Sequence, residues 1–365
     1  METGERMNIH PKDLDAIDWL ARLGAIEELE DADFDPSLVA EMARRAPLVA
    51  ARPIRFSTPT FKDYTSSELE GCAKNSFPAF SITAGGCALM CDHCEAKILE
   101  PMIPATSPEM LDRKVRDLVL LQDLQGFLLS GGSTRRNEIR YQRFYPVVEG
   151  LKRDFPHLRI AIHTALTDRE GARRMADAGV DTAMMDVIGA AETIREVYHL
   201  DRPVEDFEAT LGALCETSME VVPHIVIGLH YGRILGEATA LDIVARHRVH
   251  ALVLVVLMPF YAKPGSFVTP DAHDVGRVFL AARRRLPDQE VLLGCARPPG
   301  MHKRVTDAYA VMAGLDGIAF PADGMVAVAE AIGRPARQEH ACCSIKIGAR
   351  AETPLAKAQE RGCPA

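Results

Sequence analysis

Three cysteines within eight residues are the strongest chemical signal in the chain. Cys87, Cys91 and Cys94 are spaced as C-x3-C-x2-C in the segment SITAGGCALMCDHCEAKIL. Three thiolates on one loop can hold three irons of a 4Fe-4S cluster and leave the fourth iron open to a small ligand. A structural zinc site is the alternative, but zinc usually takes four ligands, and the nearest fourth candidate is His93. The spacing therefore favours a reactive, incompletely ligated cluster.

Small and acidic residues follow other apolar runs of the chain. Ser130, Gly131 and Gly132 end the run LLSGGST, and glycine allows the backbone to approach a ligand closely. A strand-end turn is the simpler interpretation of the glycine pair. Asp186 ends the run MMDVIG, where its carboxylate could accept hydrogen bonds from two vicinal hydroxyls or could cap a helix. These positions predict ligand contacts near the ends of strands.

The elements that must position these residues form a regular alternation from Phe77 onward. Eight strand–helix units in about 250 residues predict an α/β fold, a TIM-type (β/α)8 barrel whose strand ends carry the site. An open, doubly wound sheet is the alternative, since buried parallel strands look alike in either arrangement. The eight β-rich runs are FPAFSIT, GFLLSGG, RIAIHTAL, DTAMMDVIG, VVPHIVIGL, ALVLVVLMP, VLLGCARP and GIAFPAD.

Two flanking segments differ from the repeating core. Residues 1–70 are predicted to be an N-terminal helical extension, with helical spacing in DAIDWLARLGAIEEL and SLVAEMARRAPLV. Residues 71–334 are predicted to form the barrel. Residues 335–365 form a C-terminal tail with a vicinal cysteine pair, which we interpret as a lid or strap.

Net charge, the length of the apolar runs and the cysteine content indicate which partners and which cellular compartment to expect. The 365 residues carry a formal charge of −9, so we expect neither nucleic acid nor anionic lipid to be attracted by net charge. No apolar run approaches the roughly 18 to 20 residues of a membrane helix, and the first residues lack a signal-peptide core. Nine cysteines, three of them clustered, favour a metal site in a reducing compartment. We predict a cytoplasmic protein without a membrane partner.

The cysteine motif on a loop after the first strand resembles the signature of the radical S-adenosylmethionine (SAM) superfamily. In that family, the amine and carboxylate of SAM ligate the open iron. The resemblance implies that His93 contacts the adenine and that the glycine pair hydrogen-bonds the methionine ammonium group, although Ser133 stands where many members carry Glu. It also implies that Asp186 binds the ribose. The segment HIVIGLHYG is similar to the family's adenine-binding strand and nominates Ile225 and Gly228.

Further cysteines lie outside the motif. Cys295 stands beside Arg297 in LLGCARP, and we take Arg297 as a candidate cofactor contact. Cys295, Cys342, Cys343 and Cys72 could together hold an auxiliary 4Fe-4S cluster, or they could be unrelated thiols. Cys72 precedes the first predicted strand, so simple topology would start it at the opposite face of the barrel.

The order of these segments resembles the biotin synthase and lipoyl synthase branch, and is most similar to the archaeal-type, two-protein lipoyl synthases. The resemblance implies that an auxiliary cluster donates sulfur to an octanoyl chain on a lipoyl-carrier protein. It also implies a companion radical SAM protein and a ferredoxin-type electron donor. The alternatives are a cofactor-assembly enzyme that inserts no sulfur and a non-catalytic Fe-S barrel that acts as an assembly partner.

Overall fold

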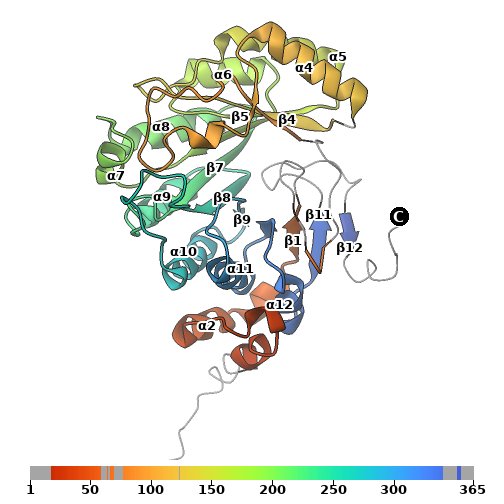
Figure 1. Cartoon of the computed structure of the whole chain (residues 1–365), viewed down its shortest axis with the longest axis vertical. Helices are drawn as coiled ribbons and strands as arrows, with labels where there is room; N and C mark the ends of the chain where they lie inside the picture. Colours follow the sequence, from red (N-terminus) through yellow and green to blue (C-terminus); the bar gives the residue numbers. More distant parts are fainter. Residues whose placement is uncertain are drawn as a thin grey trace, which may run out of the picture.

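One curled sheet organises the chain. The computed structural model describes residues 18–58, 64, 66–69, 77–122, 124–339 and 352–354, the last three as backbone only. Within these residues, twelve strands pair in the order β12-β11-β1-β10-β9-β8-β7-β6-β5-β4-β2-β3 (Figure 1). All neighbours are parallel except β11 and β12. The strands are β1 Ile54–Ser57, β2 Ala79–Ser81, β3 Ile103–Pro104, β4 Gly126–Ser130, β5 Arg159–His163, β6 Thr182–Asp186, β7 Glu220–Ile227, β8 Ala251–Val256, β9 Glu290–Leu293, β10 Gly317–Ala319, β11 Ala336–Glu339 and β12 Glu352–Pro354.

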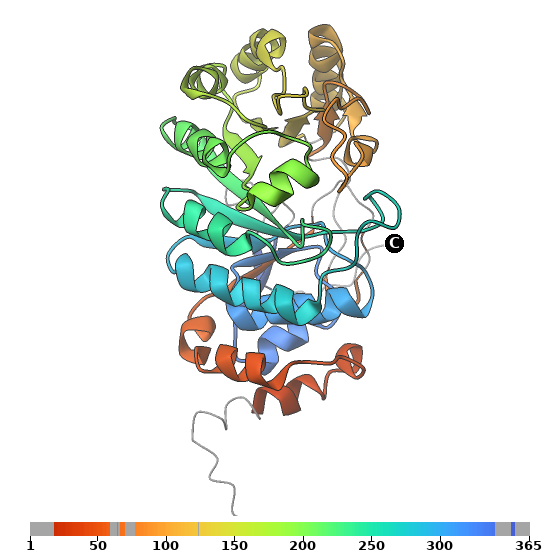
Figure 2. The same ribbon diagram turned by 90° about the vertical axis from the view of Figure 1, so that its left-hand side faces the viewer.

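Helices cover the outer face of this sheet, where they stack side by side (Figure 2). Local sequence sets several of their starts: the Ser107 hydroxyl accepts from the Met110 N–H at 3.2 Å, and proline fills the first turn. No described helix has the length and apolar character needed to span a membrane. The helices are α2 Pro36–Ala43, α3 Ala46–Ala50, α4 Pro108–Leu121, α5 Tyr145–Asp154, α6 Arg169–Asp177, α7 Ala191–Glu196, α8 Val204–Cys215, α9 Glu237–Ala245, α10 Ala272–Arg285, α11 Met301–Ala313 and α12 Met325–Ala331, with 3-10 turns η1 Glu27–Leu29, η2 Lys97–Leu99 and η3 Gln142–Phe144.

Two separate apolar cores show which way each strand residue faces. The larger core joins the helices to the outer face of the sheet, and each large apolar side chain buried there stabilises the fold by about 1.5–3 kcal/mol. The smaller core contains no helix residue and therefore lines the inner, concave face. Because side chains alternate along a strand, residues two positions beyond its members also face inward. The members of the inner core are Phe77, Ala161, Met184, Val222, Ala251, Val253 and Leu292.

The predicted α/β class and parallel sheet are confirmed, and all eight predicted runs contain strands, namely β2 and β4 to β10. Closure into a (β/α)8 barrel is not what the described strands show, because β10 pairs with β1 and β9 rather than with β2. Strand β1 arises from the segment predicted to be a helical extension, and β11 from the predicted tail. Eleven parallel strands thus form an open half-barrel.

Candidate active site

The cysteine loop follows β2 at the C-terminal edge of the sheet. Its second half is a tight turn, in which the N–H groups of Cys94 and Glu95 donate to the carbonyl of Cys91 at 3.2 and 2.9 Å. Four non-glycine residues of the loop have positive φ, which persists only where surrounding structure enforces it and which is common at functional sites. They are Ala84, Met90, Glu95 and Ala96, with φ of 51°, 49°, 44° and 62°.

The three thiols lie on one loop and are largely withdrawn from water. Cys91 is 5% exposed, while Cys87 and Cys94 are half-buried against the outer core. Burial, with a smaller contribution from Cys87 and other nearby groups, raises the pKa of the Cys94 thiol to about 11, and burial followed by the charges of Cys94 and Cys87 raises that of Cys91 further still. Bound metal removes this penalty by stabilising the thiolates. The donor set therefore fits an iron–sulfur cluster.

A mononuclear metal site is not preformed on this loop. In the described part of the chain, no three His, Cys, Asp or Glu side chains are gathered closely enough to hold one ion. Zinc is the alternative metal for these thiols, and a zinc ion needs its ligands arranged around a single point. A multi-iron cluster instead spreads its thiolate ligands over its corners.

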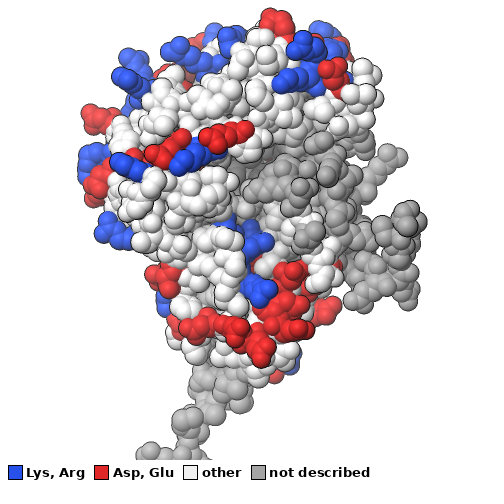
Figure 3. All heavy atoms as spheres, viewed as in Figure 1, with Lys and Arg blue, Asp and Glu red and all other residues white. Residues whose placement is uncertain are grey.

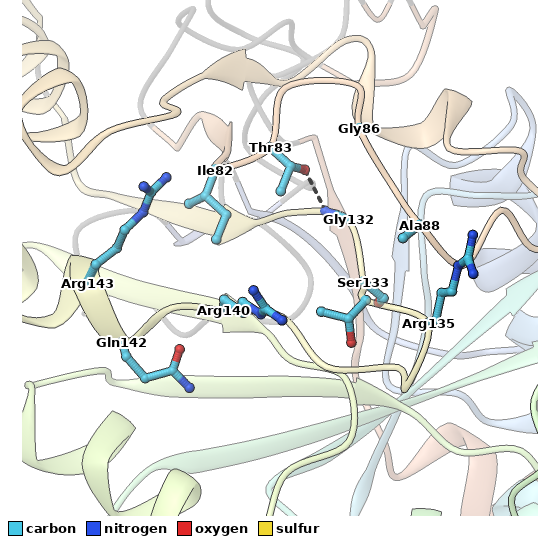
Figure 4. A pocket seen from close by; sticks show the side chains of 11 residues that line it. Ile82, Thr83, Gly86, Ala88, Gly132, Ser133, Arg135, Arg140, Gln142 and Arg143 are labelled. Atoms are coloured by element: carbon cyan, nitrogen blue, oxygen red, sulfur yellow. Dashed lines mark hydrogen bonds between the residues drawn. The ribbon is translucent and has the colours of Figure 1, made fainter.

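Glycines at the end of β4 let the cysteine loop lie against the sheet. A Cβ on Gly132 would lie 1.9 Å from the Gly86 carbonyl oxygen and 2.6 Å from the Cys87 Cα, so no side chain fits. The Gly132 N–H donates to the Thr83 Oγ1 at 2.7 Å (Figure 4), and the Ala88 N–H donates to the Ser133 carbonyl at 2.9 Å. The pair predicted to contact SAM thus also seats the loop that carries the thiols.

Asp92, which lies between Cys91 and Cys94, is hydrogen-bonded by residues of other loops at the same edge of the sheet. Its N–H donates to the Val197 carbonyl at 3.0 Å, and its carboxylate lies 2.9 Å from the His199 Nε2. The Lys263 N–H, from the loop after β8, donates to the Asp92 carbonyl at 2.8 Å. His93, the predicted adenine contact, stacks on Tyr198 with ring centroids 5.0 Å apart, and burial lowers the pKa of His93 to about 4. The neutral ring offers a flat surface to a ligand.

A polar cluster, of which sequence reasoning nominated only Asp186, lies on the inner face beside these loops. His163, Asp186 and His224 end or lie near the ends of the adjacent strands β5, β6 and β7, each two positions beyond a member of the inner core. The His163 Nε2 lies 3.7 Å from the Asp186 Oδ1, and the two imidazole centroids are 5.7 Å apart. The Tyr198 hydroxyl donates to the Asp186 Oδ2 at 3.4 Å. We call these four residues the inner polar cluster.

Charges within the inner polar cluster are fixed by its members. Burial alone would raise the pKa of Asp186, but the neighbouring His163 lowers it to about 2, so the carboxylate is ionised. Burial likewise opposes the charge on His163, yet Asp186 raises the pKa of His163 above its ordinary value. Burial and His163 lower the pKa of His224 to about 4. The concave face therefore presents an ionised carboxylate and two imidazoles, which can donate to and accept from a polar ligand.

Comparisons with known proteins agree with this geometry. A family model described as the Radical SAM superfamily matches residues 81–235, which include the cysteine loop, the glycine pair and the inner polar cluster. Residues 81–235 are thus similar to a radical SAM domain. No curated protein matches the whole sequence significantly.

Solved structures show that the radical SAM domain lies in a fold shared with known enzymes. Methylornithine synthase (PylB) superposes with a TM-score of 0.54 at 12% identity, covering 84% of this chain and 82% of that one. HydG, a maturase of the FeFe-hydrogenase, superposes with a TM-score of 0.55 at 14% identity, covering 84% and 68%. At these identities the likeness shows the fold alone. A 4Fe-4S cluster and SAM are the cofactors that the family implies for this domain.

Ile225 and Gly228, which were predicted to contact the adenine of SAM, are surrounded by other residues of the protein. Ile225 is 2% exposed and belongs to the outer core, so its side chain faces the helices, and its predicted contact with adenine is not tested. Its inward neighbour on β7 is His224. Gly228 has φ of +79°, donates its N–H to the Glu237 Oε1 at 2.8 Å, and would place a Cβ 2.2 Å from the Pro270 Cγ. Gly228 is thus required by a turn, and its contact with adenine stays a prediction.

Arg297, predicted to contact a cofactor, is bonded to other residues of the protein. Its guanidinium donates to both carboxylate oxygens of Asp307, at 2.5 and 2.8 Å. The remaining donors bond the carbonyls of Gly294, Ala319 and Phe320 at 2.7 to 2.8 Å. All five N–H groups are therefore used to tie the ends of β9 and β10 to α11, and none is left for a cofactor.

The candidate ligands of an auxiliary cluster fall into two groups. Cys295 is half-buried, two residues after the end of β9 and so at the edge that carries the radical SAM loop. Cys72, Cys342 and Cys343 lie outside the described residues. Residues 66–69, shortly before Cys72, lie against the start of α12. Glu68 accepts hydrogen bonds from the N–H groups of Gly324, Val326 and Ala327 at 2.8, 3.2 and 3.1 Å.

This placement corrects the expected topology of the segment before Cys72. The loop after β10 leads into α12, so Glu68 lies at the C-terminal edge of the sheet and not at the opposite face. The reason is strand β1, which sequence reasoning missed: it carries the chain to this edge before residues 66–69 begin.

Proposed function

We propose that the chain is a radical SAM enzyme that inserts sulfur into an unactivated C–H bond of a protein-bound octanoyl chain. In this proposal it acts as a lipoyl synthase component together with a companion radical SAM protein, and a ferredoxin-type protein supplies electrons. The observation that carries the proposal is that Cys295 and the described residues just before Cys72 and Cys342 lie at the edge of the sheet that also carries Cys87, Cys91 and Cys94.

Strand order and chain length support a shared site for those segments. Strands β9, β10, β1 and β11 are neighbours and run parallel, so their ends lie on one edge. Strands lie about 4.8 Å apart, which puts β9 and β11 about 14 Å from each other. Cys342 follows Glu339, the end of β11, by three residues, a reach of at most about 10 Å. Cys295 and Cys342 can therefore meet between these strands.

The same reach applies to Cys72, three residues after Leu69, which is 7% exposed and packs in the outer core. An auxiliary cluster on Cys72, Cys295, Cys342 and Cys343 would be held at the same C-terminal edge of the sheet and would provide the sulfur. Ligands so distant in sequence would also couple metal binding to closure of this edge.

The residues of the chain have distinct tasks in this function. When bound, the 4Fe-4S cluster and SAM supply the 5′-deoxyadenosyl radical that abstracts hydrogen. Cys87, Cys91 and Cys94 hold the cluster, and Gly132 seats their loop. His93 and Tyr198 offer a stacked aromatic surface, and the inner polar cluster orients polar groups of SAM or substrate. The apolar inner core beneath excludes water from reactive species.

The inner polar cluster favours a second candidate function. An ionised carboxylate between two imidazoles suits a small polar substrate better than an octanoyl tail. The second candidate is therefore a radical SAM cofactor-assembly enzyme that rearranges such a substrate and inserts no sulfur.

One experiment separates the candidates. Protein reconstituted anaerobically is incubated with SAM, reductant and an octanoylated lipoyl-domain peptide, with and without the companion protein, and the peptide is analysed by mass spectrometry. Sulfur insertion predicts thiolated peptide and about eight irons per chain, whereas the assembly enzyme predicts about four irons and unchanged peptide. Failure of the reduced protein to cleave SAM would contradict both and favour a non-catalytic partner.

A further inference from the structure

Four arginines lie within nine residues of the loop that joins β4 to η3. Arg135, Arg136, Arg140 and Arg143 are all exposed. With Glu138, the segment 135–143 has a net formal charge of +3, in a chain whose formal charge is −9. On the face shown in Figure 3, acidic side chains gather at the end of the molecule that carries the N-terminal helices, and basic ones are frequent at the end that carries α4 to α6. The arginine-rich loop belongs to the basic end.

These arginines form no ion pair with a described carboxylate, unlike several other arginines of the surface. Elsewhere, Arg116 pairs with Asp154 at 2.7 Å and Arg246 pairs with Glu208 at 2.8 Å. Within the described residues, no carboxylate lies within 4.0 Å of the guanidinium groups of the loop. Exposed like charges this close together repel one another, and this cost is relieved when an external anion binds.

The arginines also surround a hollow. A cavity of about 830 Å³ is lined by Arg135, Arg140, Gln142 and Arg143, together with Gly86 and Ala88 of the cysteine loop and Gly132 (Figure 4). Ile82, another lining residue, belongs to the outer core. This arginine cavity therefore lies on the outer flank of the cysteine loop, apart from the inner polar cluster.

The shape of the arginine cavity favours a protein ligand. Its guanidinium groups are spread over a broad, exposed hollow, whereas a site for one small anion gathers its donors around a point. Arg143 is held in place by a bond to the Thr106 carbonyl at 2.6 Å and by the Phe144 ring, whose centroid is 5.0 Å from its guanidinium carbon. A carboxylate-rich protein surface could engage several of these arginines at once.

We propose that the arginine cavity docks an acidic segment of the carrier protein that bears the octanoyl group. The inference rests on the proposed function and names the surface that its protein substrate recognises. The octanoyl arm must enter at the C-terminal edge of the sheet, so its carrier must sit on the rim of that edge. The arginine cavity forms a cationic part of this rim, next to the cysteine loop, and charge complementarity there would steer the carrier and fix its orientation.

The test uses charge reversal with a matched control. Arg135→Glu/Arg140→Glu is compared with Arg153→Glu/Arg285→Glu, which changes two exposed arginines at the C-terminal ends of α5 and α10, on the opposite edge of the sheet. Anisotropy of fluorescently labelled octanoylated carrier domain measures binding without turnover. Thiolation kinetics are measured with the carrier and with a short uncharged octanoyl-lysine peptide.

We expect the Arg135/Arg140 variant to bind the carrier about tenfold or more weakly, with a raised KM, an unchanged kcat and unchanged turnover of the short peptide. The control should resemble the parent, and added salt should weaken binding to the parent more than to the variant. Equal carrier affinity in parent and variant would overturn the proposal. So would a variant that loses only ferredoxin-driven SAM cleavage and keeps dithionite-driven cleavage, because the surface would then serve the electron donor. Carrier binding without any thiolation by the parent would contradict the proposed function alone.

Discussion

At the scale of single residues, the cysteine loop depends on thiols that are costly to ionise and on a glycine that nothing can replace. The burial that raises the pKa of Cys91 and Cys94 makes the metal-free loop a poor nucleophile and a good cluster site. Gly132 matters because the loop lies directly against its α-carbon. Three predictions belong to this scale.

Replacement of Cys91 by alanine should abolish SAM cleavage and remove the radical SAM cluster, because no neighbouring side chain supplies an equally soft ligand. Iron content and production of 5′-deoxyadenosine after anaerobic reconstitution measure both effects. Cys215→Ala is the control, since this thiol lies at the end of α8 and should be dispensable. Full SAM cleavage by Cys91→Ala would contradict the assignment of the cluster.

Replacement of Gly132 by alanine should displace the cysteine loop, since its Cβ would lie 1.9 Å from the Gly86 carbonyl oxygen. We expect a loss of stability of about 1–3 kcal/mol and lower iron incorporation even without SAM. Gly85→Ala in the same loop is the matched control, because a Cβ there meets nothing within 4 Å. If Gly132→Ala takes up iron normally and only SAM affinity falls, the glycine serves the ligand and not the loop.

The His163 imidazole should titrate above its ordinary pKa of 6.5 in the parent and below it in Asp186→Asn, where burial acts without the neighbouring charge. Because the folded-state pKa of His163 is raised, its contribution to stability is complete below about pH 6.5 and is lost as the pH rises through the folded value. NMR titration of the imidazoles in both proteins measures the shift. Identical titration of His163 in both proteins would show that Asp186 does not govern its charge.

At the scale of elements, buried charged side chains hold the far half of the sheet together. Arg297 and Asp307 join β9, β10 and α11, and Glu68 joins the segment before Cys72 to the first turn of α12. Three N–H groups at a helix start otherwise lack partners, so Glu68 both caps the helix and complements its dipole. These contacts determine where the cysteine-bearing segments begin.

Removal of one partner of the buried pair should be far more costly than removal of a surface pair. Asp307→Asn leaves the Arg297 charge buried and should lower the free energy of unfolding by about 3–5 kcal/mol. Arg277→Ala, which breaks the exposed pair with Asp35, should cost about 0–1 kcal/mol. Denaturant unfolding compares the two, and similar midpoints would refute the structural assignment of Arg297.

Glu68→Ala should destabilise the start of α12 by about 0.5–2 kcal/mol and loosen the segment that leads to Cys72. If Cys72 is a ligand of an auxiliary cluster, iron beyond the first four atoms should fall while SAM cleavage persists. Glu68→Gln, which keeps one acceptor oxygen, should recover part of the loss. An unchanged iron content in Glu68→Ala would show that this segment does not contribute to the proposed auxiliary site.

At the scale of the whole molecule, sequence patterns predicted the elements better than their closure. The eight long apolar runs were found because each is buried on both faces. Strand β1, IRFS, was not predicted because four residues with a central arginine show little period. Arg55 pairs there with Glu290 and Glu339, from strands distant in the sequence. The cysteine motif is local and readable, whereas His163, Asp186 and His224 meet only through the register of three strands. Period-2 alternation from the apolar inner residues was the signal that could have placed them.

The position of strand β1 in the sheet also affects the order in which the strands can pair during folding. Its two neighbours, β10 and β11, are more than 250 residues further along the chain, the longest separation between paired strands in the described sheet. Contacts this distant in sequence form late, because loop closure is costly and because synthesis proceeds from the N-terminus. The strands from β2 to β9 can assemble while β1 still waits for a partner. The cysteine loop would then be in place, and could bind its first cluster, before β10, β1 and β11 complete the other end of the sheet.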